Sequence, residues 1–255
     1  MPKKEFIFRA PLLNAAGSLG YAPKPEGPIA LDLLGAFITN PLSLSPRKPA
    51  RGPRLLPHPG GFLLHTGHPN PGLKAALRTY SSRWDRASLP ILVHLLAETP
   101  SAIARAVERL EEVDGVAGLE LSIPPDETAA GMLALIQAAV GELPVMLQLP
   151  LDRAQSLAWE AASSGVAALS LGPPRGALPG PEGALIQGRL YGPALLPHTL
   201  AAVEALHSLA LPLIAGCGIY GESDVQACLE AGAAAVQLDA VLWKGVWESR
   251  PIRKE

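Results

Sequence analysis

Four histidines carry side chains suited to metal binding or proton transfer. His58, His65 and His68 fall in one segment, and His94 lies near the end of a later apolar run. With Glu120 they could hold a metal ion that activates water in a lyase or hydrolase. The H-x6-H-x2-H spacing matches no motif of metal sites. Histidines at a pocket rim, bonded to backbone or water, fit the pattern better, so we expect no metal.

The two cysteines, Cys217 and Cys228, offer little chemistry of their own. Two cysteines are too few for a disulfide scaffold, and their spacing is not that of a zinc site. Cys217 follows a predicted strand, and Cys228 falls in a predicted helix. We expect both to pack as small apolar residues.

The composition predicts a large buried core and few charged partners. Of the 255 residues, 48% are hydrophobic and 17% are charged, and the net charge is −2. This balance predicts no surface for nucleic acid or for an anionic membrane. No apolar stretch is long enough to span a bilayer, and the first residues, MPKKEFIFRAPLL, lack the apolar segment of a signal peptide. We therefore expect a cytoplasmic protein.

Short apolar runs alternate with helical stretches along the second half of the chain. The runs predict strands at 144–149, 167–172, 212–216 and 234–238. The stretches between them predict helices at 152–165, 198–210 and 222–232. Strands separated by helices pair in parallel through right-handed crossovers. Apolar runs without polar alternation indicate strands that are covered on both faces.

The first half of the chain continues the same alternation. It predicts strands at 12–17, 36–39, 91–96 and 118–123. It predicts helices at 27–34, 72–83, 101–112 and 127–140. Eight strands and about eight helices predict an α/β protein with a single (β/α)8 TIM barrel domain over 1–255. A doubly wound open sheet is the rival fold, and the barrel is favoured because the units run the whole length without a second domain.

Two long segments interrupt the alternation, at about 45–72 and 172–193. Both are rich in proline and glycine, and both leave the carboxyl end of a predicted strand, where barrel enzymes place their sites. Long irregular segments in compact domains are usually functional. Surface loops stiffened by proline explain the composition equally well, so both interpretations stay open.

Five segments, in order along the chain, resemble those of the FMN-dependent dihydroorotate dehydrogenase family, class 1-like. They are PLLNAAGSLGY (11–21), ITNPLSLSPRKPARGPRLLPHPGGFLLHTGHPNPGL (38–73), LELSIPP (119–125), LYGPALLPHTL (190–200) and PLIAGCGIYGESDVQACLEAGAAAVQLDAVLW (212–243). The resemblance implies a flavoprotein oxidoreductase of pyrimidine biosynthesis. It implies FMN at the barrel mouth and hydride transfer from dihydroorotate to the flavin.

The catalytic base of the family has no counterpart at its usual place. The family uses Cys or Ser just before Pro-Asn, and the matching stretch here, 122–126, is one residue shorter. The base position falls at Pro124 or Pro125, and proline has no side-chain proton acceptor. Asp126 or Glu127 would substitute for it, or would serve as an acid at a helix N-terminus. The catalytic residue is therefore left unassigned.

The positions that contact the flavin in the family are also altered. By resemblance they are Ala15, Ala16, Gly17, Asn40, Gln148, Gly192, Gly218, Ile219, Asp239 and Ala240. Asn40 and Gln148 stand where the family has lysines, so positive charge is lost. Asp239 and Ala240 replace the Gly-Thr that cradles the phosphate. A carboxylate there opposes phosphate binding, unless Asp239 turns away to cap the last helix.

The substrate positions are changed in the same way. By resemblance they are His65, Gly67, Asn70, Ser122 and Asp126. His65 stands for the first asparagine of the family loop, whereas Gly67 and Asn70 match. Ser122 and Asp126 replace two further asparagines. Asp126 would repel the carboxylate of orotate if its loop were similarly placed.

Three hypotheses follow for function. The first is an FMN oxidoreductase like dihydroorotate dehydrogenase, which acts on dihydroorotate or another small-molecule substrate. The second is a non-catalytic barrel that serves as a binding or regulatory protein. A metal-dependent lyase or hydrolase is third. The substitutions favour the second hypothesis over genuine dihydroorotate oxidation. The expected partners are a small-molecule substrate or flavin and a second copy of the chain in a homodimer.

Overall fold

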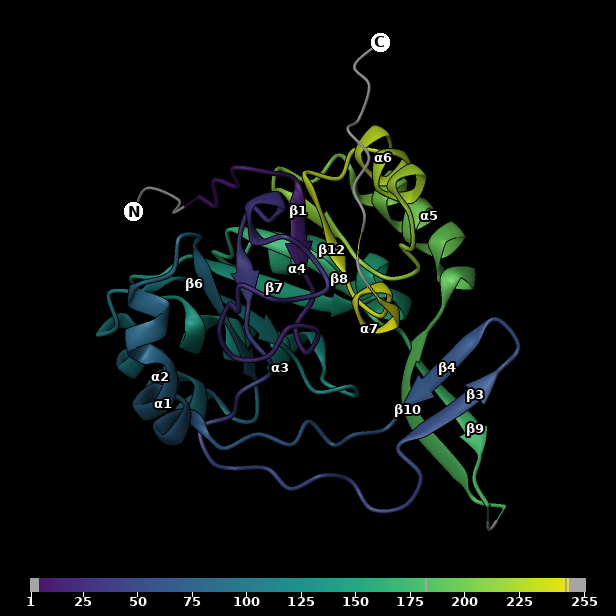
Figure 1. Ribbon diagram of the computed structural model, residues 1–255, viewed down its shortest axis with the longest axis horizontal. Coiled ribbons are helices and arrows are strands. Elements are labelled where there is room, and N and C mark those ends of the chain that lie inside the picture. The colour runs from purple at the N-terminus through teal and green to yellow at the C-terminus, as the bar shows by residue number, and fades with distance from the viewer. Residues whose placement is uncertain (1–4, 182, 246, 248–255) are drawn as a thin grey trace.

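A closed barrel of eight parallel strands forms the body of the protein (Figure 1). The computed structural model describes residues 5–181, 183–245 and 247. The strands are β1 (Leu12–Asn14), β2 (Phe37–Ile38), β5 (Ile91–Leu96), β6 (Val116–Ser122), β7 (Val145–Pro150), β8 (Ala168–Gly172), β11 (Leu213–Ala215) and β12 (Ala235–Leu238). Their order is β1-β12-β11-β8-β7-β6-β5-β2, and a parallel bridge between Leu13 and Ala36 closes the ring. The predicted (β/α)8 barrel and its eight strands are confirmed.

Helices surround the barrel and follow its strands. They are α1 (Leu73–Asp85), α2 (Pro100–Glu111), α3 (Ala129–Ala139), α4 (Ala154–Ala162), α5 (Leu196–Leu206), α6 (Glu222–Glu230) and α7 (Val241–Lys244), with 3-10 turns η1 (Leu31–Leu33), η2 (Leu151–Arg153) and η3 (Pro193–Leu195). The predicted helix at 27–34 is therefore reduced to the turn η1. Pro28 lacks an N–H and Ala30 is extended, so too few residues remain for a full helix.

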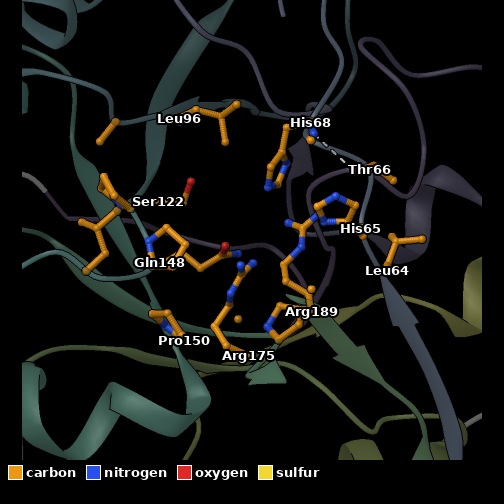
Figure 2. A pocket seen from close by; sticks show the side chains of 18 of the residues that line it. Leu64, His65, Thr66, His68, Leu96, Ser122, Gln148, Pro150, Arg175 and Arg189 are labelled. Atoms are coloured by element: carbon orange, nitrogen blue, oxygen red, sulfur yellow. Dashed lines mark hydrogen bonds between the residues drawn. The ribbon is translucent and has the colours of Figure 1, made fainter. Parts of the chain in front are cut away.

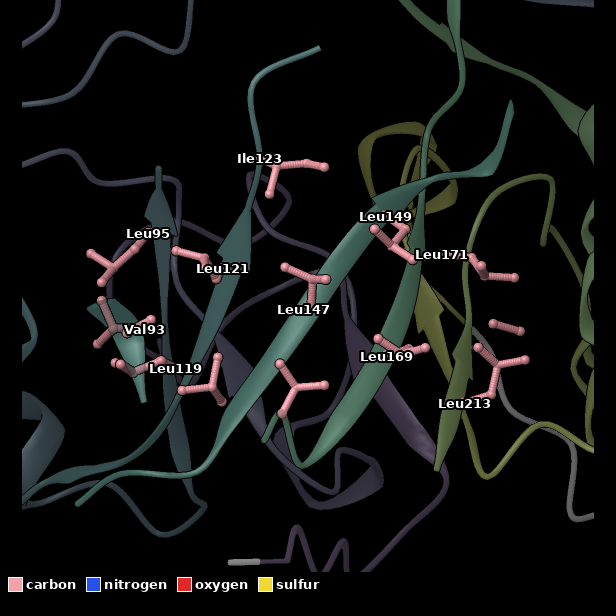
Figure 3. Packing of buried hydrophobic residues seen from close by; sticks show 14 of the residues in the cluster. Val93, Leu95, Leu119, Leu121, Ile123, Leu147, Leu149, Leu169, Leu171 and Leu213 are labelled. Atoms are coloured by element: carbon pink, nitrogen blue, oxygen red, sulfur yellow. The ribbon is translucent and has the colours of Figure 1, made fainter. Parts of the chain in front are cut away.

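Alternation along the strands places apolar side chains on the outer face of the barrel, against the helices. Figure 3 shows this layer, with Leu119 and Leu121 of β6 beside Leu147 and Leu149 of β7. The intervening residues point inward. They form a lower layer that is wholly apolar: Leu13, Ala36, Ile38, Leu92, Met146, Ala168, Ile214 and Ala235. One layer higher, toward the carboxyl ends of the strands, the inward residues become polar.

The two long segments form a second sheet beside the barrel (Figure 1). The segment 45–72 contains β3 (Leu55–His58) and β4 (Gly61–Leu64), and the segment 172–193 contains β9 (Arg175–Pro179) and β10 (Leu185–Tyr191). All neighbours in the order β3-β4-β10-β9 are antiparallel. The segments are thus less irregular than expected. Their strands escaped prediction because each pairs with residues far away in the sequence, which leaves no local period.

A close backbone approach brings the start of β4 and the end of β10 together within this small sheet. A Cβ on Gly61 would lie 1.9 Å from the carbonyl oxygen of Tyr191, and one on Gly192 would lie 2.1 Å from that of Gly60. Only glycine fits at either place. Glycine at these two positions thus lets the start of β4 and the end of β10 pack closely.

Both cysteines are buried and unpaired, as predicted for packing residues. No helix among the described residues is long and apolar enough to cross a membrane. Within those same residues, no three side chains of His, Cys, Asp or Glu are grouped to hold a metal ion.

Candidate functional site

Glu120 is the centre of the polar layer inside the barrel. It lies on β6 and is fully buried. One carboxylate oxygen accepts from His94 Nδ1 at 2.6 Å. The other accepts from Ser170 Oγ at 2.8 Å and from Gln237 Nε2 at 2.6 Å. Three strands besides its own thus supply donors to one buried carboxylate, which satisfies the charge that burial would otherwise make costly.

These hydrogen bonds decide the charge of Glu120. Burial alone would raise the pKa of this carboxyl group, but the hydrogen bond and charge of His94, together with the bonds from Gln237 and Ser170, lower it on balance. Glu120 is therefore a carboxylate and can only accept. It follows that His94 Nδ1 carries a proton and donates it to Glu120, while Nε2 faces Ser122 Oγ at 3.1 Å.

A pocket of about 380 Å³ opens above this layer (Figure 2). Its floor is formed by residues at the carboxyl ends of β5 to β8, including Leu96, Ser122, Pro150 and Gly172. The small sheet and the segment before it supply the other wall. That wall contains His65, His68, Arg47, Arg175 and Arg189.

Positive charge dominates this pocket. Burial lowers the pKa of Arg175, and the charge of Arg189 adds to the effect. Burial also lowers the pKa of His68 to about 2, again helped by Arg189, so His68 is neutral. Arg47 pairs with Glu98 at 3.4 Å on the surface. Arg175 and Arg189 are directly opposite one another in the β9–β10 pairing, so their charges lie side by side on one wall of the pocket and repel, an arrangement that a bound anion would relieve.

The other half of the barrel mouth is closed. Ala15, Ala16, Gln148 and Asp239 line one hollow there, so these flavin-contacting positions do converge. The hollow measures only about 20 Å³. Tyr191, which stacks on Phe62 with ring centroids 5.3 Å apart and contacts Trp243 at 5.4 Å, fills much of the space. Arg189 also lines this hollow.

Two carboxylates already occupy backbone donors at the end of the mouth where the resemblance places a phosphate. Asp224 Oδ2 accepts from the N–H groups of Tyr220 and Gly221, at 2.9 and 3.0 Å. Asp239 Oδ1 accepts from the N–H of Ala240. Burial raises the pKa of Asp239 to about 6. Asp239 does not cap α7 by its side chain, which contradicts that alternative.

The remaining positions predicted to contact a flavin have structural roles. Asn40 Oδ1 accepts from the N–H of Gly20 at 3.1 Å. Gly17 and Gly218 adopt positive φ, and Ile219 is buried in the core around the barrel. Gly192 packs against Gly60 and Gly61 at the edge of the small sheet. None of these last four offers a polar side chain to a ligand.

The substrate positions divide between the pocket and the scaffold. His65, Gly67 and Ser122 line the pocket, and Pro124 and Pro125 lie at its edge. Asn70 is buried and accepts from the N–H groups of Ser43 and Gly72, so it holds its own loop.

Asp126 lies outside the pocket lining. It is near enough to Arg175 for its charge to oppose the lowering of the arginine pKa. Sequence reasoning missed Arg175 and Arg189 because they lie on strands that were read as loops. The polar residues in alternate positions of 185–191, Gln187 and Arg189, were the available signal.

The fold and the position of the pocket define an α/β barrel protein with a pocket at the carboxyl ends of the strands, where barrel enzymes place their sites. Comparison with relatives of known family identifies the protein more closely. A dihydroorotate dehydrogenase B (NAD(+)) catalytic subunit from Pelobacter propionicus is 31% identical over 255 residues, which cover 91% of this chain and 83% of the relative. Another, from Desulforudis audaxviator, is 32% identical over 250 residues, covering 90% and 81%. The chain belongs to the dihydroorotate dehydrogenase family.

Solved structures support the same fold. The crystal structure of dihydroorotate dehydrogenase from Eimeria tenella in complex with ferulenol matches with a TM-score of 0.72 at 16% identity. The match covers 93% of this chain and 78% of that one. No protein-family model matches the chain.

Proposed function

We propose that this barrel binds a small anionic ligand between Arg175 and Arg189, and that it does not oxidise dihydroorotate through bound FMN. The observation that carries the proposal is the cationic pocket of about 380 Å³ at the carboxyl ends of β5 to β8. That volume lies in the range of small-molecule sites, roughly 300–1,000 Å³. The proposal follows the binding hypothesis reached from the sequence.

A carboxylate or phosphate is the ligand chemistry that this pocket favours. Guanidinium groups bind such anions through paired N–H donors, and they do so best where water is partly excluded. Both arginines belong to the small sheet, so a ligand bound to them would rest on the barrel mouth below. Gln148 and Ser122 then offer uncharged polar contacts from the barrel side.

The residues at the flavin-contacting positions do not fit FMN. A hollow of about 20 Å³ is far below what a flavin ring needs. At the phosphate end, a dianion would meet Asp224 and Asp239, whose oxygens already hold the backbone donors. The negative charges of these two carboxylates would repel the phosphate and oppose its binding.

A flavin-dependent oxidoreductase is the second candidate, and family membership favours it. The convergence of Ala15, Ala16, Gln148 and Asp239 on one hollow also favours it. This function would require Tyr191 and Trp243 to leave the mouth. The relatives are named as catalytic subunits, so it would also call for a partner subunit.

Calorimetric titration of the purified chain with orotate, succinate, inorganic phosphate and FMN separates the two candidates. We expect one or more of the small anions to bind and FMN not to bind. Arg189→Ala should weaken anion binding by about 2 kcal/mol, or tens of fold. The matched control is Arg105→Ala on α2, an exposed arginine outside the pocket, which should bind as the parent does.

Two results would decide against the proposal. Yellow protein whose flavin is bleached by dihydroorotate under anaerobic conditions would establish the second candidate. Equal anion binding by the parent and by Arg189→Ala would remove the arginine pocket as the site.

A further inference from the structure

Three side chains, running from the floor of the pocket down into the buried polar layer, stand in the order serine, histidine, carboxylate; Ser122 lines the pocket, and His94 and Glu120 lie beneath it. Ser122 Oγ lies 3.1 Å from His94 Nε2, and His94 Nδ1 lies 2.6 Å from Glu120 Oε2. We propose that Ser122 is a nucleophile for acyl transfer, with His94 as its base. The substrate is an ester, thioester or amide that carries an anionic group. The inference rests on the anion pocket proposed above, which would hold that group.

The direction of each hydrogen bond suits this role. Nδ1 of His94 donates to Glu120, and in the neutral imidazole Nε2 is then an acceptor. Ser122 can then donate its hydroxyl proton to Nε2. The other acceptor near this hydroxyl, the carbonyl of Leu95, is farther away at 3.5 Å. A nucleophile bonded to a base, which a third group orients, is the arrangement that activates serine.

The environment of Ser122 differs from that of an ordinary buried serine. Ser170 also bonds to Glu120, but it is fully buried and lines neither hollow. Ser122 ends β6 at the barrel mouth and lines the pocket. In Figure 2 it points into the same space as Gln148, Arg175 and Arg189. Its hydroxyl therefore has access to a ligand.

Gln148 is placed to stabilise the negative charge that develops during such an attack. It lies directly opposite Ser122 in the β6–β7 pairing and lines the pocket. Its side-chain amide makes no hydrogen bond within the part of the chain that the structure describes. An amide donor beside the nucleophile acts as an oxyanion donor.

The reaction balances without a metal or an oxidant. Ser122 Oγ forms a bond to the acyl carbon while its proton passes to His94 Nε2. The bond from that carbon to the leaving group then breaks, and the leaving alcohol, thiol or amine takes the proton from His94. Water attacks the acyl-serine, loses its proton to His94, and releases a carboxylic acid. The proton on His94 returns to Ser122.

A neutral fluorophosphonate tests the nucleophile directly. The full chain is incubated with the reagent, and the adduct is located by mass spectrometry of peptides. We expect modification at Ser122, none in Ser122→Ala, and parent-like labelling in Ser163→Ala, a matched exposed serine on the surface of α4's end. An unlabelled parent chain would overturn the proposal.

Hydrolysis of aryl esters tests the reaction and its substrate class. The half-ester of succinic acid with p-nitrophenol, an anion, should be cleaved faster than p-nitrophenyl acetate. Ser122→Ala should lower kcat by about 10³-fold or more. Ser122→Cys keeps the contact with His94 and should alkylate with iodoacetamide at neutral pH. An unreactive thiol in a folded Ser122→Cys protein contradicts activation by His94.

Glu120 acts as a positioning residue. Glu120→Gln should lower kcat with little change in KM, because an amide can hold His94 in the wrong tautomer. Glu120→Asp should restore part of kcat, which a merely structural role would not produce. A folded Glu120→Gln protein with unchanged kcat would contradict this role.

Failure of this inference is distinguishable from failure of the proposed function. Anion binding without labelling or ester cleavage overturns the nucleophile and leaves the arginine pocket. Labelling of Ser122 by the neutral reagent, with no anion bound and no preference for the anionic ester, overturns the pocket and leaves the nucleophile.

Discussion

The two halves of the barrel mouth stand on the same polar layer but differ in what covers them. Above β5 to β8 the mouth opens into a pocket of about 380 Å³ lined by arginines. Above β1, β11 and β12 it shrinks to about 20 Å³ and is lined by Tyr191, Trp243 and Asp239. One half thus suits an anion, and the other excludes it.

The difference comes from one strand of the small sheet. Arg189 and Tyr191 are two residues apart on β10, so they point to the same side of that strand. Arg189 lies at the border and lines both halves, whereas Tyr191 lines the closed half only. The segment over the mouth thus decides which part of the barrel mouth stays open, while the barrel below supports both halves.

The largest loss of stability is expected from a substitution in the polar layer that lies beneath both halves. Glu120→Ala removes the acceptor of His94, Ser170 and Gln237 in the barrel interior. The free energy of unfolding should fall by about 3–5 kcal/mol. Urea denaturation measures it, with Glu98→Ala as the exposed control, which should change by less than about 1 kcal/mol. Equal stability of Glu120→Ala and the parent would mean that the layer does not depend on this carboxylate.

The closed half can be opened at Tyr191. Tyr191→Ala removes a buried ring that packs on Phe62 and Trp243 and should cost about 3 kcal/mol of stability. FMN should still not bind, because Asp224 and Asp239 keep the phosphate end negative. Thermal unfolding and FMN titration check both statements. Binding of FMN by Tyr191→Ala would show that the aromatic side chain alone excludes the cofactor.

Asp239 makes the closed half sensitive to pH. Its pKa of about 6 in the folded chain exceeds the ordinary value of 3.8, so the folded state binds more protons between these values. Stability should therefore fall as pH rises through this window, by about 3 kcal/mol in total. Asp239→Asn should lose this dependence in urea titrations at pH 4 to 7. An identical pH profile in both proteins would count against the buried carboxyl group.

The smallest change in stability is expected for the ion pair on the surface of the open half. Arg47 and Glu98 are both more than a third exposed, so their ion pair is screened by solvent. Arg47→Ala should change the free energy of unfolding by no more than about 0.5 kcal/mol. Denaturation with and without added salt measures this effect. A loss of several kcal/mol would indicate that Arg47 has a structural role in the pocket wall.

The eight barrel strands could be predicted because each is a continuous apolar run that needs no knowledge of its neighbours. The helix predicted at 27–34 failed where Pro28 and the extended Ala30 interrupt it. The small sheet could not be predicted in the same way. Its strands β4 and β10 belong to segments far apart in the chain, and prolines and glycines hide their alternation.

The sequence by itself determined the alternation of strands and helices and the family, because each is a property of residue types in order. Only the tertiary structure decided that Ser122, His94 and Glu120 meet and that Arg175 and Arg189 face them. The physical reason is that barrel closure and strand register choose which inward side chains become neighbours.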